Sequence, residues 1–396
     1  MLLYIHVPFC RRKCRYCAFH SEPQMGEEPA ESALRMRAYM DVLMLELAQW
    51  ADRLGKQPVE TVFFGGGTPS LLPPRSVGTI LERVRRCFKL SPGAEITLEA
   101  NPESLNTRGL VRDYMRVGVN RISLGIQSLD DDMLTLLGRM HRASGAITAY
   151  RAVRDAYCPN VSVDLMWGLP GQKLRHWRQT LKEVIGLRPD HLSAYGLTLE
   201  PGTPLDSDCE SGLLTLPPER EQASMYIQGA ELLEEAGLMQ YEVSNFARMG
   251  YQCRHNLGYW EGQDYLGLGP AATSTFAGRR WTNPPDLSLW GRQVTAKRIS
   301  DDLETLDTVT RVLELMMLRL RTTRGLRIRA YKDLTGRDFM KDHKKFIHAL
   351  HKNGLIRILN GYLSLTRSGM LVSNSILGNL FETAHTLLDT PALVKD

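Results

Sequence analysis

Short apolar segments alternate with amphipathic helical patterns along the first half of the chain, and this alternation constrains the fold more than any other feature. The predicted strands are residues 3–7, 59–64, 95–100, 121–126, 161–166 and 191–199. The predicted helices between them include residues 32–54, 77–88, 108–116 and 175–185. Six successive strand–helix units imply an α/β fold with a parallel sheet and helices outside it, either an open doubly wound sheet or an incomplete barrel.

Several predicted strands end in residues that are unusual for a sheet interior. Three glycines at 65–67 follow the second strand, and Glu99, Gln127 and Asp164 lie at or near the ends of the next three. A carboxylate buried in a sheet without a partner is costly, so these positions indicate a ligand. Both closures bind ligands at the carboxyl ends of their strands, and we expect the site there.

The composition is that of a globular protein, because 43% of the 396 residues are hydrophobic and 23% are charged. This balance excludes a disordered chain, a collagen-like fibre and a disulfide-packed secreted module. No apolar run approaches the roughly 20 residues that span a bilayer. The first ten residues are interrupted by His6 and Pro8 and lack a basic leader, so no signal peptide and a cytoplasmic location are expected.

Three of the seven cysteines, Cys10, Cys14 and Cys17, lie within eight residues just after the first predicted strand. Such clustering indicates metal or redox chemistry more than disulfides. Three thiolates on one loop can hold three irons of a [4Fe–4S] cube and leave the fourth iron open to another ligand. Structural zinc, with His6 or His20 as a fourth ligand, is the alternative.

Basic side chains alternate with these cysteines and are expected to lower the thiol pKa values and to offset the negative charge of a cluster. They also offer a docking surface for an acidic electron donor such as flavodoxin, although a merely solvated loop is the alternative. These residues are Arg11, Arg12, Lys13 and Arg15.

The segment from Tyr4 to Cys17 reads Tyr-x-His-x-Pro-Phe-Cys-x3-Cys-x-Tyr-Cys and resembles the signature of radical S-adenosylmethionine (SAM) proteins. Together with Gly-Gly-Gly-Thr-Pro at 65–69 the match is specific, and the likeness covers nearly the whole chain. Within that superfamily the chain resembles the branch of oxygen-independent coproporphyrinogen III oxidase and the related heme chaperones. The resemblance implies an incomplete, TIM-like (β/α)6 barrel of radical SAM type with a small C-terminal winged-helix-like α+β domain.

The resemblance also implies a set of SAM-binding residues, with the glycine-rich segment holding the amino group of SAM. Glycines lack side chains and let a ligand lie against the backbone, although a glycine run is also a common turn. An ordinary polar layer capping a barrel is the alternative for the polar positions, and a core aromatic is the alternative for the tyrosine. The implied residues are Tyr4, Gly66, Gly67, Thr68, Glu99, Gln127, Arg139 and Asp164.

In the resembled family an electron from the cluster cleaves SAM to methionine and a 5′-deoxyadenosyl radical, while the protein orients the reactants and excludes solvent. Two departures disfavour coproporphyrinogen oxidation as the use of that chemistry here. The oxidase has a further functional cysteine two residues after its last motif cysteine, where this chain has Phe19. The oxidase also carries a substantial segment before its motif, where this chain has three residues before Tyr4.

The segment His255–Trp260 fits His-Asn-x-x-Tyr-Trp, a motif resembling that of the heme chaperone branch. A histidine beside two aromatic rings can offer an axial imidazole and a flat apolar face to heme. Cys253 is an alternative thiolate ligand, and a packed polar-aromatic corner is the structural alternative to heme binding.

We expect three regions: a radical SAM partial barrel at 1–200, a barrel extension and covering segment with the His-Asn-x-x-Tyr-Trp motif at 201–300, and a winged-helix-like domain at 301–396. In the last region, helices are predicted at 309–320, 326–334 and 339–352, followed by a hairpin that turns at Asn360-Gly361.

The C-terminal region is strongly basic, since residues 319–358 hold twelve Lys or Arg against three Asp. A solvated face is the first interpretation, docking of an acidic protein or of heme propionates is the second, and nucleic acid is the least favoured.

Taken together, these patterns and the resemblance predict a cytoplasmic heme chaperone that binds a [4Fe–4S] cluster, SAM and heme and delivers heme to a respiratory apoprotein. The alternative is a coproporphyrinogen oxidase-type radical SAM enzyme, and whether SAM is cleaved productively is left open by the residues.

Overall fold

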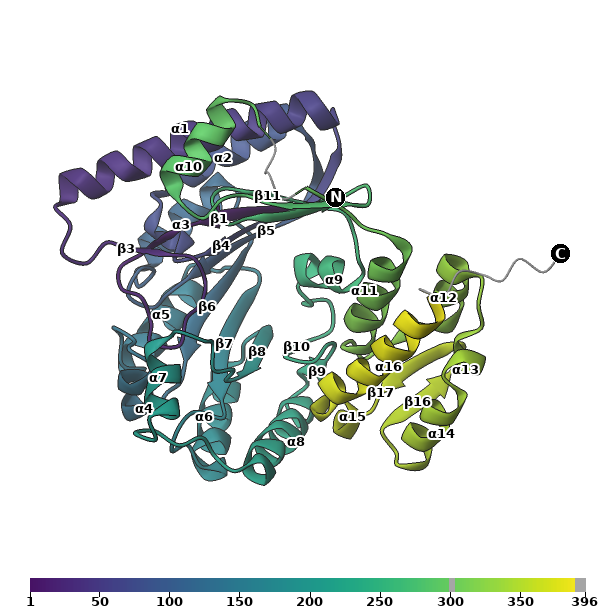
Figure 1. The fold of residues 1–396 in the computed structure, drawn as a ribbon. Coiled ribbons are helices and arrows are strands. Elements are labelled where there is room, and N and C mark those ends of the chain that lie inside the picture. Colours follow the sequence, from purple (N-terminus) through teal and green to yellow (C-terminus); the bar gives the residue numbers. More distant parts are fainter. Residues whose placement is uncertain (299–302, 389–396) are drawn as a thin grey trace.

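A computed structural model of the chain describes residues 1–298 and 303–388 (Figure 1). Its frame is a twelve-stranded sheet with the order β14-β13-β12-β11-β1-β4-β5-β6-β7-β8-β10-β9. The run from β1 to β8 in this order is parallel throughout and curves as an open arc, which confirms the predicted six units. These strands are β1 (Leu2–Val7), β4 (Pro58–Gly66), β5 (Lys89–Ala100), β6 (Arg121–Gln127), β7 (Val161–Trp167) and β8 (His191–Gly196).

Helices cover the outer, convex side of the arc. Side chains alternate across each strand, so one set packs under these helices and the other set faces the inside of the arc. Val62 and Phe64 of β4 are fully buried in the layer beneath the helices, whereas Thr61 and Phe63 face inward. The outer helices are amphipathic, as in α2, where the buried positions 77, 80, 81 and 84 form one stripe. They are α1 (Pro29–Leu54), α2 (Pro74–Cys87), α3 (Arg108–Val117), α4 (Asp131–Leu136), α5 (Ala143–Asp155), α6 (Leu174–Leu187) and α8 (Glu219–Glu235).

The segment 201–300, expected to be a barrel extension and covering segment, supplies strands to both edges of the sheet. On one edge β10 (Asn245–Ala247) pairs antiparallel with β8, and β9 (Met239–Gln240) lies beyond it. On the other edge β11 (Tyr265–Leu268) pairs parallel with β1 and is followed by β12 (Thr273–Phe276), β13 (Arg279–Thr282) and β14 (Glu304–Thr305). Between them in sequence, α9 (Arg254–Trp260) lies on the inner side of the arc (Figure 1).

The C-terminal region has a hydrophobic core of its own and contains the predicted hairpin. Asn360 and Gly361 both have positive φ, at 50° and 78°, as a two-residue turn of this kind requires. Two expectations are wrong in detail: residues 326–327 form a strand rather than the start of a helix, and His343 divides the helix expected at 339–352. The elements are α11 (Thr308–Leu320), β15 (Leu326–Arg327), α12 (Ile328–Thr335), α13 (Phe339–Asp342), α14 (Lys344–Lys352), β16 (Ile356–Leu359), β17 (Tyr362–Leu365), α15 (Arg367–Leu371) and α16 (Ser373–Leu388).

Two further sequence expectations concern boundaries. The strand expected at 191–199 is shorter in the structure, where β8 ends at Gly196. The domain boundary expected near residue 301 lies outside the described residues. Within the described part of the chain, none of the helices has the length and hydropathy that crossing a membrane requires.

A buried carboxyl group joins α1 to the loop after β11. Glu46 is 3% exposed and accepts hydrogen bonds from the Gly269 backbone N–H (2.8 Å) and the Asn283 side-chain amide (2.7 Å). Burial raises the pKa of Glu46 from 4.5 to about 7. The folded state therefore binds more protons than the unfolded state between these pH values, so this group's contribution to stability is lost as the pH rises through 7.

Glu46→Gln removes this titration, so we expect its unfolding midpoint to fall less than that of the wild type between about pH 6 and pH 8. Differential scanning fluorimetry at stepped pH measures the difference, with the exposed Glu31→Gln on the same helix as the control. Parallel pH profiles of wild type and Glu46→Gln would contradict the assignment.

Candidate functional site

The loop that carries the three cysteines is closed by a short parallel pair, β2 (Phe9–Cys10) and β3 (Glu22–Pro23). Arg35 of α1 forms ion pairs with Glu22 and Glu27 and so fixes the end of the loop. Cys10, Cys14 and Cys17 are free, partly buried thiols.

These cysteines line one side of a cavity of about 600 Å³, which we call the cysteine cavity. Its other walls come from the carboxyl ends of β4 to β8, where the sequence predicted a site. Seven of the eight predicted SAM residues line it: Gly66, Gly67, Thr68, Glu99, Gln127, Arg139 and Asp164. The structure thus brings them together, and their binding of SAM stays a prediction.

The end of β4 touches the cysteine loop so closely that glycine is required there. A Cβ on Gly67 would lie 2.5 Å from the Phe9 carbonyl oxygen and 3.0 Å from Cys10 Sγ. The Thr68 backbone N–H donates to the same carbonyl (2.7 Å), and Thr68 Oγ1 lies 3.5 Å from Cys10 Sγ. The bare backbone of β4 therefore forms a cradle under the first cysteine, as a cluster on this loop needs.

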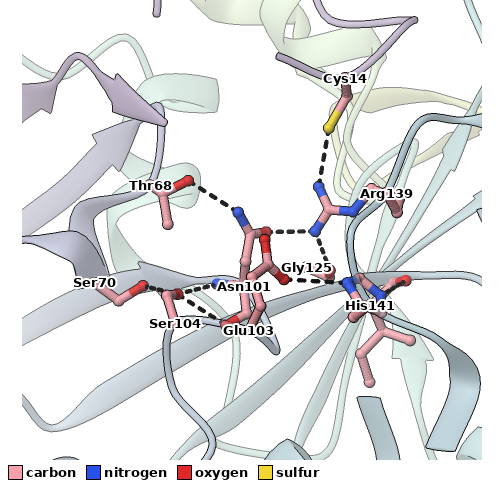
Figure 2. A network of polar contacts seen from close by, with 10 residues as sticks. Cys14, Thr68, Ser70, Asn101, Glu103, Ser104, Gly125, Arg139 and His141 are labelled. Carbon is pink, nitrogen blue, oxygen red and sulfur yellow. Dashed lines mark hydrogen bonds and ion pairs between the residues drawn. The ribbon is translucent and has the colours of Figure 1, made fainter. Parts of the chain in front are cut away.

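A hydrogen-bonded network joins the cysteine loop to the strand ends (Figure 2). Arg139 donates through Nη1 to Cys14 Sγ (3.4 Å) and through Nη2 to the Gly125 carbonyl (2.8 Å) and to Asn101 Oδ1. Asn101 Nδ2 in turn donates to Thr68 Oγ1 (2.9 Å). Cys14 is thereby connected through one arginine and one asparagine to the residue that contacts Cys10. Asn101 was missed by the sequence analysis, although it lies two residues after Glu99 in the same strand-end motif.

The electrostatics of the loop differ from expectation. Burial raises the pKa values of the Cys10 and Cys17 thiols and outweighs the opposing effect of nearby cations. The basic residues of the loop act weakly because Arg11, Arg12 and Lys13 are exposed to solvent and Arg15 pairs with Asp208. The cation that contacts a cysteine sulfur is instead Arg139. Burial alone would lower the pKa of Arg139, but the nearby Tyr16, Cys14 and Glu103 outweigh this effect, so its pKa is raised.

Two partly buried carboxyl groups face the cavity opposite the cysteines. Burial raises the pKa of Glu99 to about 8, and the neighbouring Asp164 adds to this effect. Burial also raises the pKa of Asp164, whose two oxygens each accept from Ser123 Oγ at 3.1 Å. Carboxyl groups held this way, without an ion pair of their own among the described residues, suit a ligand that carries positive charge and hydroxyl groups. Ser123 was also missed, although it shares the inner face of β6 with Gln127.

Gln127 is held at the cavity by an irregularity in β6. The register with β7 shifts between Gly125 and Gln127, and Gln127 has a φ of 65°. A bulge of this kind re-aims the side chain at the end of a strand.

The predicted residues Tyr4 and His255 line an adjoining inner cavity of about 210 Å³. His255 is 1% exposed and its ring stacks on Phe63, with centroids 5.0 Å apart. Its Nδ1 bonds Thr61 Oγ1 (2.7 Å) and its Nε2 bonds Tyr259 Oη (3.0 Å), while burial lowers its pKa to about 3. Both ring nitrogens therefore have protein partners, and axial ligation by His255 requires release from Tyr259.

Two individual ligands that the sequence allowed, Cys253 for heme and His6 for zinc, find no support in the geometry. Cys253 is fully buried against Glu95, with 3.5 Å between Sγ and Oε1, and burial raises its pKa to about 12. His6 bonds Tyr4 Oη through Nδ1 and the His20 carbonyl through Nε2, so its ring is not free to join the cysteines around zinc. In the described residues no three His, Cys, Asp or Glu side chains are set to hold one metal ion, whereas the cysteines of a [4Fe–4S] cube each bind a different iron.

Sequence comparison identifies the family. The heme chaperone HemW of Bacillus subtilis is 32% identical over 377 residues, which cover 95% of this chain and 97% of that protein. The chain belongs to the HemW family of radical SAM proteins. A radical SAM superfamily profile matches residues 4–184, and a HemN C-terminal domain profile matches residues 306–372.

Other HemW relatives agree with this assignment. Escherichia coli HemW is 41% identical over 270 residues, 68% of each chain. A mitochondrial relative from Bos taurus, radical S-adenosyl methionine domain-containing protein 1, is 37% identical over 396 residues that cover 96% of this chain and 86% of that protein. Among solved structures, coproporphyrinogen III oxidase (HemN) from Escherichia coli superposes with a TM-score of 0.80 at 22% identity, covering 98% and 90% of the two chains. At this identity the likeness shows a shared fold.

Gly67→Ala places a methyl group against the Phe9 carbonyl, so we expect the cysteine loop to shift and the protein to lose most of its iron. Iron and sulfide content after anaerobic reconstitution measures this. Gly93→Ala, where a Cβ meets nothing within 4 Å, is the control. Wild-type iron content in Gly67→Ala would refute the cradle.

Asn101→Ala breaks the bridge between Thr68 and Arg139 while leaving all three cysteines in place. We expect iron content to be retained and SAM affinity to fall about tenfold, equivalent to about 1.4 kcal/mol. Equilibrium dialysis of labelled SAM against reconstituted protein tests this, with the exposed Asn106→Ala as the control. Equal SAM affinities for wild type and Asn101→Ala would remove Asn101 from the site.

Proposed function

We propose that this protein is a heme chaperone that holds a [4Fe–4S] cluster on Cys10, Cys14 and Cys17, binds SAM beside it, and binds heme for delivery to a respiratory apoprotein. The observation that carries this proposal is the similarity to heme chaperone HemW along 95% of the chain. The similarity extends through both the barrel and the C-terminal region, so it is not limited to the cofactor motif.

The cysteine cavity supports the cofactor part of the proposal. Three cysteines on one loop match a cluster with one open iron, and the cavity beside them continues to the carboxyl ends of the strands. When bound, the cluster supplies the electron that SAM chemistry needs. The chain's own residues orient the ligand: the glycines of β4 leave room for it, Glu99 and Asp164 accept its hydrogen bonds, and Arg139 fixes the loop.

The residue two positions after the last motif cysteine supports a chaperone over an oxidase. Phe19 stands where the oxidase has a functional cysteine, and its ring is 70% exposed at the junction of the cysteine and inner cavities. A phenyl ring has no thiol to take part in hydrogen or electron transfer. An exposed aromatic ring at a cavity mouth is instead suited to contact with a flat apolar ligand.

The electron donor and the location are also part of the proposal. Arg11, Arg12 and Lys13 are exposed on the cysteine loop and suit docking of an acidic donor such as flavodoxin close to the cluster. A cytoplasmic location agrees with cysteines that are all unpaired in the described structure.

An anaerobic hemin titration of the reconstituted protein, followed at the Soret band, tests the function. We expect saturation near one heme per chain and subsequent transfer to an apo-cytochrome. Cys14→Ala should lose the cluster. Absence of saturable heme binding in the wild type would contradict the proposal.

The same titration tests the predicted heme ligand. His255→Ala should weaken hemin binding about tenfold and change the EPR signature of the ferric iron if the imidazole is released from Tyr259 to the iron. An unchanged titration and spectrum would exclude His255 as the ligand without affecting the proposed function.

A further inference from the structure

A cavity of about 1110 Å³ lies between α11, the end of α9 and strands β11 to β13. We call it the α11 cavity. Tyr4, Phe19 and Tyr259 line both this cavity and the inner cavity, so the two adjoin. Trp260 is the last residue of the His-Asn-x-x-Tyr-Trp motif. It lines the α11 cavity but neither the inner cavity nor the cysteine cavity. The proposed function gives this space no occupant.

One face of α11 forms a wall of the cavity. Six residues of α11 line the cavity. Five of them, at 311, 314, 315, 318 and 319, follow the spacing of one helical face and extend over about 12 Å of helix, and Met317 lies beside this face. Leu315 and Leu318 form the apolar middle of this face, and Arg311 and Arg319 lie at its two ends.

Aromatic side chains contribute to the rest of the lining. Tyr259 and Tyr265 pack edge to face, with centroids 4.7 Å apart, and Trp260 lies beside them on α9. Leucines and aromatic rings lining one space of this volume suit a flat, largely apolar molecule.

Arg319 lies half-buried at one end of the cavity. Arg280 is paired with Glu314 (2.5 Å), but Arg319 forms no ion pair among the described residues and donates only to the Glu261 carbonyl oxygen (3.0 Å). Burial lowers the pKa of Arg319. The Glu261 carboxylate opposes this effect, and the like charge of Arg324 adds to it. Two neighbouring guanidinium groups, one of them half-buried, favour a carboxylate ligand, which can accept charge-assisted hydrogen bonds from Arg319.

We propose that the α11 cavity binds the tetrapyrrole, with the macrocycle between Leu315 and Leu318 on one side and Tyr259 and Trp260 on the other, and with its carboxylate side chains at Arg319. This inference rests on the proposed function and assigns its heme to a place. The macrocycle then adjoins Tyr259, the hydrogen-bond partner of His255, and does not occupy the cysteine cavity.

Iron-free protoporphyrin IX tests the site independently of any axial ligand, because its binding cannot depend on coordination. Fluorescence titration of the full-length, reconstituted protein should give at least tenfold tighter binding of the diacid than of its dimethyl ester. Arg319→Gln should weaken binding of the diacid about tenfold and abolish this preference. Arg357→Gln, which removes an exposed arginine of β16 outside the cavity, should change neither.

A second variant tests the apolar wall. Leu318→Gln should weaken the diacid and the dimethyl ester equally, while iron content and unfolding midpoint stay at wild-type values. If the wild type binds hemin but Arg319→Gln and Leu318→Gln keep wild-type porphyrin affinities, the α11 cavity is not the site and the proposed function still stands. If the wild type binds neither hemin nor porphyrin, the proposed function itself fails.

Discussion

The arrangement of the site depends on the close contact between the cysteine loop and the glycine-rich end of β4. The Phe9 carbonyl accepts the Thr68 backbone N–H at 2.7 Å, and a single Cβ on Gly67 would separate the two segments. This contact places Cys10 beside Thr68, and Asn101 and Arg139 extend it to Cys14. The loop is thus fixed against the strand ends by backbone contact first and by side-chain hydrogen bonds second.

Two binding regions meet at this loop. The cysteine cavity holds the groups expected to bind the cluster and SAM, and the α11 cavity holds an apolar and aromatic surface with a half-buried guanidinium group at one end. Ala18 and Phe19, directly after the last cysteine, line both regions. In the proposed arrangement, heme lies next to the cysteine loop but outside the cavity in which SAM is expected. The thiol present at this point in the oxidase is replaced here by an exposed phenyl ring.

The parallel core and the position of the site could be predicted from the sequence because both follow from local patterns. Apolar periodicity marks the six strands, and polar residues at their ends, such as Glu99 and Asp164, converge because parallel strands share one carboxyl edge. Features that depend on distant partners could not be predicted. Asn101 gains its role only when Arg139 meets it, and His255 is enclosed by Thr61 and Tyr259. The edge strands from 239 to 282 pair with β8 and β1, which no local pattern indicates.

With the cysteine cavity and the α11 cavity separate, we expect one chain to hold its cluster, SAM and a tetrapyrrole at the same time. The decisive experiment is native mass spectrometry of the reconstituted 44.7 kDa protein with SAM and heme added together. We expect one species that carries one [4Fe–4S] cluster, one SAM and one heme per chain. Species that carry either SAM or heme, but never both, would show that the two ligands compete for one cavity and would contradict it.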